Sequence, residues 1–280
     1  MNVQIKQKIG FGVLFAATLL VVVPIVAIIG LIITKGWSAI SWEFLFSMPK
    51  DGMRAGGVFP AIVGTFYLVS GAILFSLPIG VMAAIYLNEY AKDNALTRLI
   101  NLAIINLAGV SSVVYGLFGL SLFVVFFKFG VSIISGSLTL GIMTLPVIIT
   151  TTREALRAVP KSFRQVSFSL GATRWQTVRH SVLPFALPGI LTGAILSIGR
   201  AAGETAPILF TVAAFYVPDL PKSPFDQTMA LPYHLYIIST QIPNIREDYR
   251  YGTALVLVGL VLIVNISATI VRARYRRKKW

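Results

Sequence analysis

The chain has 280 residues, of which 56% are hydrophobic and only 12% are charged, whereas about a quarter of the residues in a soluble domain are charged. This composition excludes an ordinary soluble domain and indicates an integral membrane protein, and the absence of cysteine excludes disulfide bonds, thiol catalysis and cysteine-bound metal. The formal net charge of +14 leaves nucleic-acid binding as an alternative until the positions of the basic residues are considered.

Six apolar segments are long enough to cross a bilayer, which takes about 20 mostly apolar residues. They cover residues 9–33, 60–87, 106–127, 131–150, 186–212 and 251–271. The first is too long for the core of a signal peptide, so we expect it to remain as a span. Polar residues dilute the start of the third, and residues 92–105 before it are predicted to lie at the membrane interface or to form an amphipathic entry. We therefore predict an all-α integral membrane protein with a single transmembrane domain over residues 1–280.

The positions of lysine and arginine predict the orientation of the spans, because cytoplasmic loops carry an excess of both. With the N-terminus in the cytoplasm, the inner segments hold 16 of the 24 basic residues and the outer loops hold 7. We therefore predict a multi-pass protein of the cell membrane with both termini in the cytoplasm. The basic tail at residues 272–279 directly follows a span, so we expect it to contact anionic lipid rather than nucleic acid.

The cytoplasmic loop at residues 153–184 is basic and predicted to form two short helices. Pro160 suits the first turn of the first helix. An apolar stripe follows on one helix face, made of Phe163, Val166 and Leu170. Gly171 is the residue expected where a helix ends in a left-handed conformation.

The second helix of the loop is predicted to begin with a capping box formed by Thr173 and Gln176 and to end at Pro184. Its apolar stripe consists of Trp175, Val178 and Val182. A helix–glycine–helix unit this short can fill a groove on a partner protein. The alternative is a pair of helices that lies on the lipid surface.

Two charged residues, Arg200 and Glu204, fall inside the fifth apolar segment. Arg200 is 14 residues beyond Ala186, or about 21 Å along a helix, where a charge is costly unless it faces a partner or a hydrated path. Their spacing of four places both on one helix face, and small residues on the same span permit close helix packing: Gly189, Gly193, Gly199 and Gly203. We interpret the pair as part of a substrate pathway, with an ion pair that locks the helices or a subunit interface as the alternative.

The cytoplasmic loop resembles the coupling loop of ABC importer permeases, whose pattern is Glu-Ala-Ala, three residues, Gly, nine residues, Ile, any residue and Leu-Pro. Gly171, Leu183 and Pro184 match this pattern. Gln165, Val166 and Ser167 replace Glu-Ala-Ala, and Ser181 replaces the isoleucine, so the polar contact of the leading glutamate is not carried over. The resemblance implies that the loop fits a cleft in an ATPase subunit through Phe163, Gln165, Val166, Leu170, Gly171, Leu183 and Pro184.

Residues 106–240 are similar to phosphate-specific importer permeases of the PstA type, and the run Gly-Arg-Ala-Ala-Gly-Glu-Thr at 199–205 carries most of this resemblance. It implies the fold of type I ABC importer permeases, with six transmembrane helices and cytoplasmic coupling helices, and phosphate import by alternating access. The implied partners are a cytoplasmic ATP-binding subunit, a second homologous permease subunit and an extracytoplasmic phosphate-binding protein. Arg200 would offer donors to the oxyanion, and Glu204 would neutralise it when the path is empty.

No nucleotide-binding loop of the G-x-x-x-x-G-K-[ST] type occurs, so we expect a transport subunit without catalytic residues or cofactor. His180 and His234 are far apart in the sequence, and no metal site is expected. Three alternatives stay open: a sulfate- or molybdate-type permease, an anion transporter driven by an ion gradient, and a purely structural membrane subunit. The outer segment 213–250 is a weaker candidate for receiving a substrate-binding protein, the alternative being an ordinary connector.

Overall fold

The computed structural model describes residues 3–217 and 219–277, which are mainly helical. The long helices are α1 (Val3–Gly36), α3 (Phe59–Ile85), α6 (Ile133–Arg157), α9 (Leu183–Gly203) and α12 (Glu247–Arg277). The shorter α-helices are α2 (Trp42–Phe46), α4 (Ala95–Ala108), α5 (Ser112–Gly119), α7 (Lys161–Ser169), α8 (Arg174–Thr177), α10 (Ala206–Thr211) and α11 (Leu231–Thr240). Three π-helical turns, η3 (Tyr86–Tyr90), η4 (Leu120–Phe126) and η5 (Val178–Val182), extend or join helices. Two 3₁₀ turns, η1 (Trp37–Ala39) and η2 (Asp51–Met53), and a short antiparallel hairpin of β1 (Pro49–Lys50) and β2 (Ala55–Gly56) complete the described elements.

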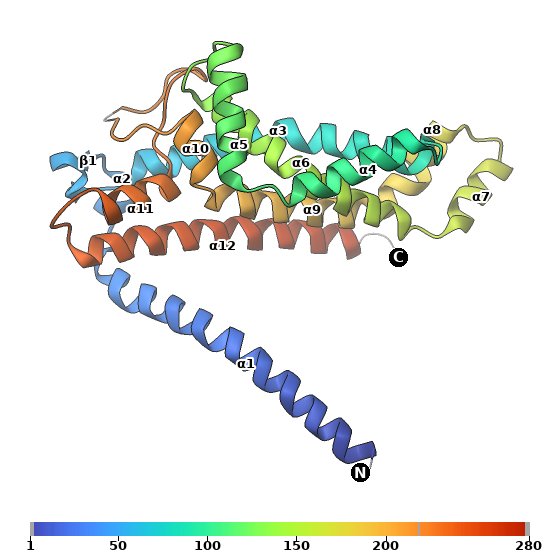
Figure 1. The fold of residues 1–280 in the computed structure, drawn as a ribbon, viewed down its shortest axis with the longest axis horizontal. Coiled ribbons are helices and arrows are strands. Elements are labelled where there is room, and N and C mark those ends of the chain that lie inside the picture. The colour runs from blue at the N-terminus through green and yellow to red at the C-terminus, as the bar shows by residue number, and fades with distance from the viewer. Residues whose placement is uncertain (1–2, 218, 278–280) are drawn as a thin grey trace.

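The molecule is elongated along the direction of its long helices (Figure 1). One end, called here the hairpin end, carries α2, the β1–β2 hairpin and α11. The opposite end, called here the loop end, carries α7 and α8 (Figure 1). The beginning of α1 and the end of α12 also lie toward the loop end, and α1 diverges from the other helices. The first residues of α1 and the last residues of α12 therefore lie on the same side of the molecule as α7 and α8 (Figure 1).

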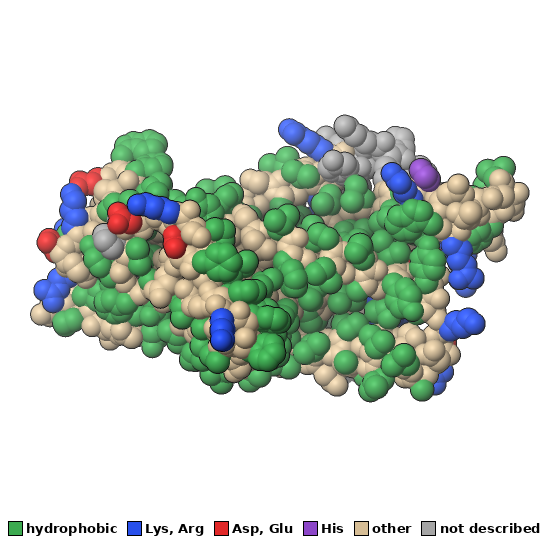
Figure 2. Space-filling view, turned by 90° about the horizontal axis from the view of Figure 1, so that it is seen from above, with side chains coloured by type: hydrophobic (Ala, Val, Ile, Leu, Met, Phe, Trp, Pro, Cys, Tyr) green, Lys and Arg blue, Asp and Glu red, His purple; other side chains and the backbone are tan. Residues whose placement is uncertain are grey.

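Within the described part of the chain, five helical segments are long and apolar enough to cross a membrane, or six if α4 and the stretch Ser112–Phe126 count as one bent span. The predicted segments 9–33 and 251–271 lie within α1 and α12, and 60–87 lies within α3 and η3. The predicted segment 131–150 begins two residues before α6 and otherwise lies within it. On the visible face, apolar side chains cover the middle of the molecule and charged side chains gather mainly toward its two ends (Figure 2). This arrangement matches a protein whose middle lies in hydrocarbon.

The third predicted span, 106–127, does not form one straight helix. α4 ends at Ala108, a new helix begins at Ser112, and the two are bent by 105°. The Tyr115 hydroxyl donates a hydrogen bond of 2.8 Å to the Leu107 carbonyl across the bend. The sequence did not predict this bend, because the number of apolar residues sets the length of a span but not its straightness.

The fifth predicted span, 186–212, also differs in the structure. The helical segment runs without interruption from Arg174 through η5 and α9 to Gly203, so Pro184 does not end the second loop helix. A proline crowds the carbonyl four residues before it, and the wider π turn directly before Pro184 relieves this constraint. At the other end α9 stops at Gly203, and Glu204 is extended with ψ 135° before α10 begins.

Two of the four glycines predicted to permit close helix packing, Gly189 and Gly193, set the packing of α9 on α6. Gly199 lies instead against Asn265 of α12, and a Cβ atom at Gly203 would meet no atom within 4 Å. A Cβ atom at Gly193 would overlap the Thr151 hydroxyl, and one at Gly189 would overlap the Ala155 methyl. The side of α9 that carries these glycines therefore packs directly on α6 with no room for larger side chains.

Candidate functional site

The loop between α6 and α9 is the first candidate site, and its local structure largely follows the sequence prediction. Pro160 lies directly before α7. Gly171 has φ +80°, which confirms that it breaks the helix in the left-handed region. Thr173 Oγ1 accepts from the Gln176 N–H at 3.3 Å and Gln176 Oε1 accepts from the Thr173 N–H at 2.8 Å, which confirms the capping box.

The predicted stripe on α7 is not covered by the rest of the described chain. Val166 is 61% exposed and Leu170 is 83% exposed. Phe163 is less exposed, and its ring centroid lies 5.0 Å from that of Phe185 at the start of α9. An apolar stripe that is exposed beside basic residues is typical of a surface that meets another protein or lipid.

The remaining predicted residues of the loop divide between surface and core. Gln165, Trp175 and Pro184 are exposed and Leu183 is half-buried. Val178 and Val182 are buried in an apolar cluster that joins the ends of α3, α6 and α9. The second predicted stripe therefore belongs mainly to the protein core, and α7 presents the larger exposed surface.

An ion pair that the sequence analysis missed fixes α7 to the rest of the molecule. Arg164 donates to both carboxylate oxygens of Glu89 in η3, at 2.6 Å and 3.1 Å. The same guanidinium donates to the carbonyls of Leu156 and Val159 at 3.0 Å each. The sequence offered one clue to this ion pair, because Glu89 is one of few acidic residues in the segments predicted to be cytoplasmic.

The second candidate site is the ion pair of Arg200 and Glu204, whose Nε and Oε1 atoms are 3.4 Å apart. The side chains are 33% and 18% exposed, respectively. Both residues were predicted to lie along one helix, but Arg200 lies in the last turn of α9 and Glu204 lies just beyond its end. The ion pair therefore bridges a helix break within the predicted fifth segment.

The surroundings of this break are partly open and partly packed. A Cβ atom built at Gly203 would meet no atom within 4 Å. On another side, Gly116 of α5 lies against the backbone of α10 at Ala206 and Pro207. Irregular backbone at membrane depth is tolerated only where protein covers it or where it borders a water-filled cavity. The break thus combines a paired cation and anion with adjacent free space.

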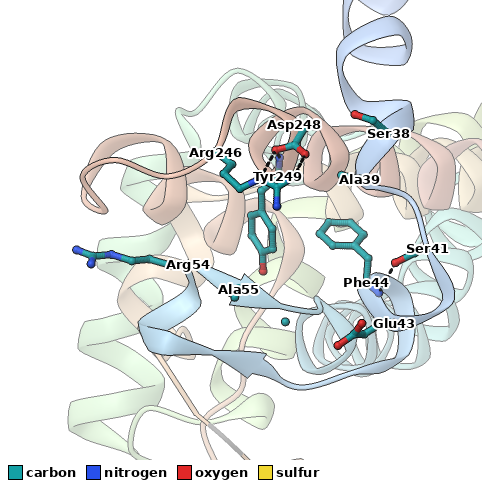
Figure 3. Close-up of a pocket in the computed structure, with 11 residues that line it drawn as sticks. Ser38, Ala39, Ser41, Glu43, Phe44, Arg54, Ala55, Arg246, Asp248 and Tyr249 are labelled. Atoms are coloured by element: carbon teal, nitrogen blue, oxygen red, sulfur yellow. Dashed lines mark hydrogen bonds and ion pairs between the residues drawn. The ribbon is translucent and has the colours of Figure 1, made fainter.

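A polar cleft of about 290 Å³ lies at the hairpin end (Figure 3). Its charged lining residues are Glu43, Arg54, Arg246 and Asp248. The Tyr249 side chain from the start of α12 points toward β2 and packs edge-on against Phe44, with 5.2 Å between ring centroids. Arg246 is paired with Asp248, whereas Arg54 points away from the other labelled side chains (Figure 3). The mixed charges around an aromatic floor suit contact with a protein surface better than selective binding of an anion.

The two histidines have different environments. His180 is exposed, whereas His234 in α11 is 2% exposed and neither of its ring nitrogens has a hydrogen-bond partner among the described residues. Burial lowers the pKa of His234 from 6.5 to about 4. Within residues 3–217 and 219–277 no group of three His, Asp or Glu side chains could hold a metal ion.

The sequence matches a family model described as "Binding-protein-dependent transport system inner membrane component" over residues 76–279. Among its relatives, "Probable ABC transporter permease protein YqgI" of Bacillus subtilis is 34% identical, and the match covers 96% of this chain and 95% of that protein. "Phosphate transport system permease protein PstA 1" of Mycobacterium tuberculosis is 32% identical, and the match covers 99% and 90% of the two chains.

Solved structures show the same fold at low sequence identity. A chain of a bacterial ABC transporter that imports the acidic polysaccharide alginate aligns with a TM-score of 0.64 and 14% identity, covering 97% of this chain and 99% of that one. A chain of the MetNI methionine ABC transporter in an inward-facing conformation aligns with a TM-score of 0.61 and 14% identity, covering 78% and 97%.

Proposed function

The chain belongs to the family of binding-protein-dependent transport system inner membrane components, and from this premise we propose that it moves inorganic phosphate into the cell. It is a membrane permease subunit of an ABC importer and is not itself a catalytic subunit. The phosphate assignment is supported by the relatives of the PstA type and by the chemistry of Arg200 and Glu204.

The observation that carries the proposal is the ion pair at the helix break. The guanidinium of Arg200 is a planar donor suited to two oxygens of an oxyanion. While no substrate is present, the Glu204 carboxylate pairs with the Arg200 guanidinium, so that neither charge is left unpaired in the membrane region. Arriving phosphate would exchange with the Glu204 carboxylate, and the free space beside Gly203 gives room for that exchange.

The energy for transport would come from a cytoplasmic ATP-binding subunit that receives the exposed stripe of α7. Leu170 and Val166 would enter an apolar groove of that subunit, while the basic residues of the loop remain at its rim. This assignment places the loop end in the cytoplasm, in agreement with the excess of basic residues in the segments predicted to be inside. A second homologous permease subunit would complete the path, and an extracytoplasmic phosphate-binding protein would dock at the hairpin end, where the cleft with Arg246 and Asp248 lies.

Uptake into vesicles tests the proposal. The complex of the chain with its partner subunits is reconstituted into lipid vesicles, with ATP on the side of the membrane that carries the ATP-binding subunit. Uptake of labelled phosphate is then measured in the presence of excess unlabelled phosphate, sulfate or molybdate. We expect uptake to require ATP and to be competed by phosphate alone. Competition by sulfate or molybdate would assign the chain to a different oxyanion, and uptake that follows an ion gradient without ATP would contradict the coupling to an ATPase.

A further inference from the structure

One guanidinium joins α7 to the ends of two long helices. Arg164 binds Glu89 beyond the end of α3 through two hydrogen bonds, and it binds the carbonyls of Leu156 and Val159 at the end of α6. Among the described residues, the two bonds to Glu89 are the only hydrogen bonds or ion pairs that connect α7 to the segment formed by α3 and η3.

The environment of this pair distinguishes it from the other ion pairs at the loop end. The side chains of Arg164 and Glu89 are only 18% and 12% exposed, whereas those of Arg98 and Asp93 are 71% and 76% exposed. Exposed pairs contribute little because water and salt screen them. A shielded bidentate pair is stronger and directional, and lysine cannot reproduce its geometry.

The other contacts of α7 lead to a different part of the molecule. Ser167 and Thr177 hydroxyls are 2.8 Å apart, which ties α7 to α8, and the Phe163 ring packs on Phe185 at the start of α9. These contacts connect α7 to α8 and to the start of α9. Within the described ranges, the contact of Arg164 with Glu89 is the only polar, directional contact that α7 makes on the α3 side.

Glu89 itself lies in a π-helical turn, η3, which closes with a bond of 2.9 Å from the Ala91 N–H to the Tyr86 carbonyl. π turns are uncommon and are often found at functional positions. A carboxylate on such a turn is attached to the continuous helix of α3 and can transmit a pull along it.

We propose that Glu89 and Arg164 form a mechanical link that carries displacement of α7 to α3, so that both α3 and α9 follow the loop during the transport cycle. Both are positioning residues and neither contacts the transported ion. The inference rests on the proposed docking of α7 on an ATP-binding subunit. Without the link, the loop would still bind that subunit, but its movement would reach α3 only through apolar packing and not through a directional contact.

A distance measurement tests the link directly. The chain lacks cysteine, so spin labels can be placed at introduced cysteines in an otherwise cysteine-free complex, at Tyr86 in η3 and at Lys161 in α7. We expect the distance between the labels to stay constant when ATP is added, because the two segments move together. With Glu89→Gln, the distance should change or its distribution should broaden on ATP addition. A distribution that stays as narrow and as constant as in the unmodified pair would overturn the link.

A functional measurement separates this link from the docking itself. For Glu89→Gln we expect the ATP-binding subunit to co-purify in normal amount, while phosphate uptake per ATP hydrolysed falls by about fivefold or more. Arg164→Lys should also lower the phosphate uptake per ATP hydrolysed. Glu89→Asp keeps the carboxylate, so it should lower this ratio less than Glu89→Gln does. Asp93→Asn, which removes the carboxylate of the exposed pair, is the matched control and should leave the ratio unchanged.

The outcomes of these experiments are distinguishable. A wild-type ratio in Glu89→Gln would overturn the link while leaving the proposed docking intact. Loss of the ATP-binding subunit from Glu89→Gln alone would mean that the pair shapes the docking surface, which also overturns the link. If the ATP-binding subunit does not co-purify even with the unmodified chain, the proposed function fails and the link fails with it.

Discussion

The guanidinium of Arg200 and the carboxylate of Glu204 form an ion pair, with 3.4 Å between Nε and Oε1, across the end of α9 rather than along a continuous helix. A cation in the last turn of a helix interacts favourably with the helix dipole. The anion that completes the pair lies on extended backbone beyond the helix, and its backbone N–H donates a long bond of 3.5 Å to the Ala201 carbonyl of α9. The pair is therefore placed where an exchange of partners does not require the helix to unwind.

Replacing Arg200 by glutamine should lower phosphate uptake by about 10- to 100-fold, the effect of losing a charged hydrogen bond. Uptake into vesicles is compared after correction for the amount of chain in the membrane, which should be near normal. Arg98→Gln is the matched control, because it removes an arginine whose side chain is 71% exposed in an ion pair with Asp93.

The double variant Arg200→Gln with Glu204→Gln separates a pathway role from a structural lock. A structural ion pair often tolerates joint replacement by neutral residues, so restored uptake in the double variant would support the lock. Persistent loss of uptake in a stable double variant is expected if Arg200 contacts the ion. Unchanged uptake in Arg200→Gln alone would remove this residue from the pathway.

Replacing Gly171 should affect docking according to the backbone conformation that the new residue tolerates. At φ +80° a valine is strained by about 1–3 kcal/mol, whereas asparagine adopts left-handed conformations more readily. No atom lies within 4 Å of a Cβ at this position, so the effect would come from the backbone and not from a clash. We expect Gly171→Val to lose the ATP-binding subunit or uptake and Gly171→Asn to keep most of both. Equal behaviour of the two variants would contradict a role of the turn.

The orientation of the chain can be measured with single cysteines and an impermeant thiol reagent on intact cells. Ser38 and Gln227, which are both exposed, should react from outside, and Ser169 in α7 should react only after the cells are opened. The reason is the excess of basic residues on the side of α7. Labelling of Ser169 but not of Ser38 and Gln227 in intact cells would invert the orientation and contradict docking of α7 in the cytoplasm.

His234 predicts how stability depends on pH. Its pKa is about 4 in the folded protein and 6.5 when unperturbed, so the unfolded chain binds the additional proton between these values. Stability should therefore fall as the pH is lowered from 6.5 to 4, by about 3 kcal/mol from this group alone. Thermal unfolding in detergent at several pH values should show a weaker pH dependence for His234→Leu than for the unmodified chain. His180→Leu, at an exposed position, is the control and should keep the original dependence.

Local sequence determined much of the candidate docking loop. Gly171, Thr173 and Gln176 act through their own backbone within a few residues, so their spacing was enough to predict the helix break and the capping box. The membrane class and most of the spans were predictable for a similar reason, because crossing a bilayer depends on the length and composition of a single segment.

Tertiary structure decided the features that depend on residues far apart in the chain. The contact of Arg164 with Glu89 joins positions 75 residues apart, and no local pattern relates them. The sequence also did not predict the bend near Leu107 and Tyr115 or the end of α9 before Glu204. The length and apolar composition of a segment are the same whether its helix is straight, bent or broken. The burial of Val178 and the exposure of Leu170 were separated only by packing, since both lie on apolar helix faces but only one of these faces meets α3 and α6.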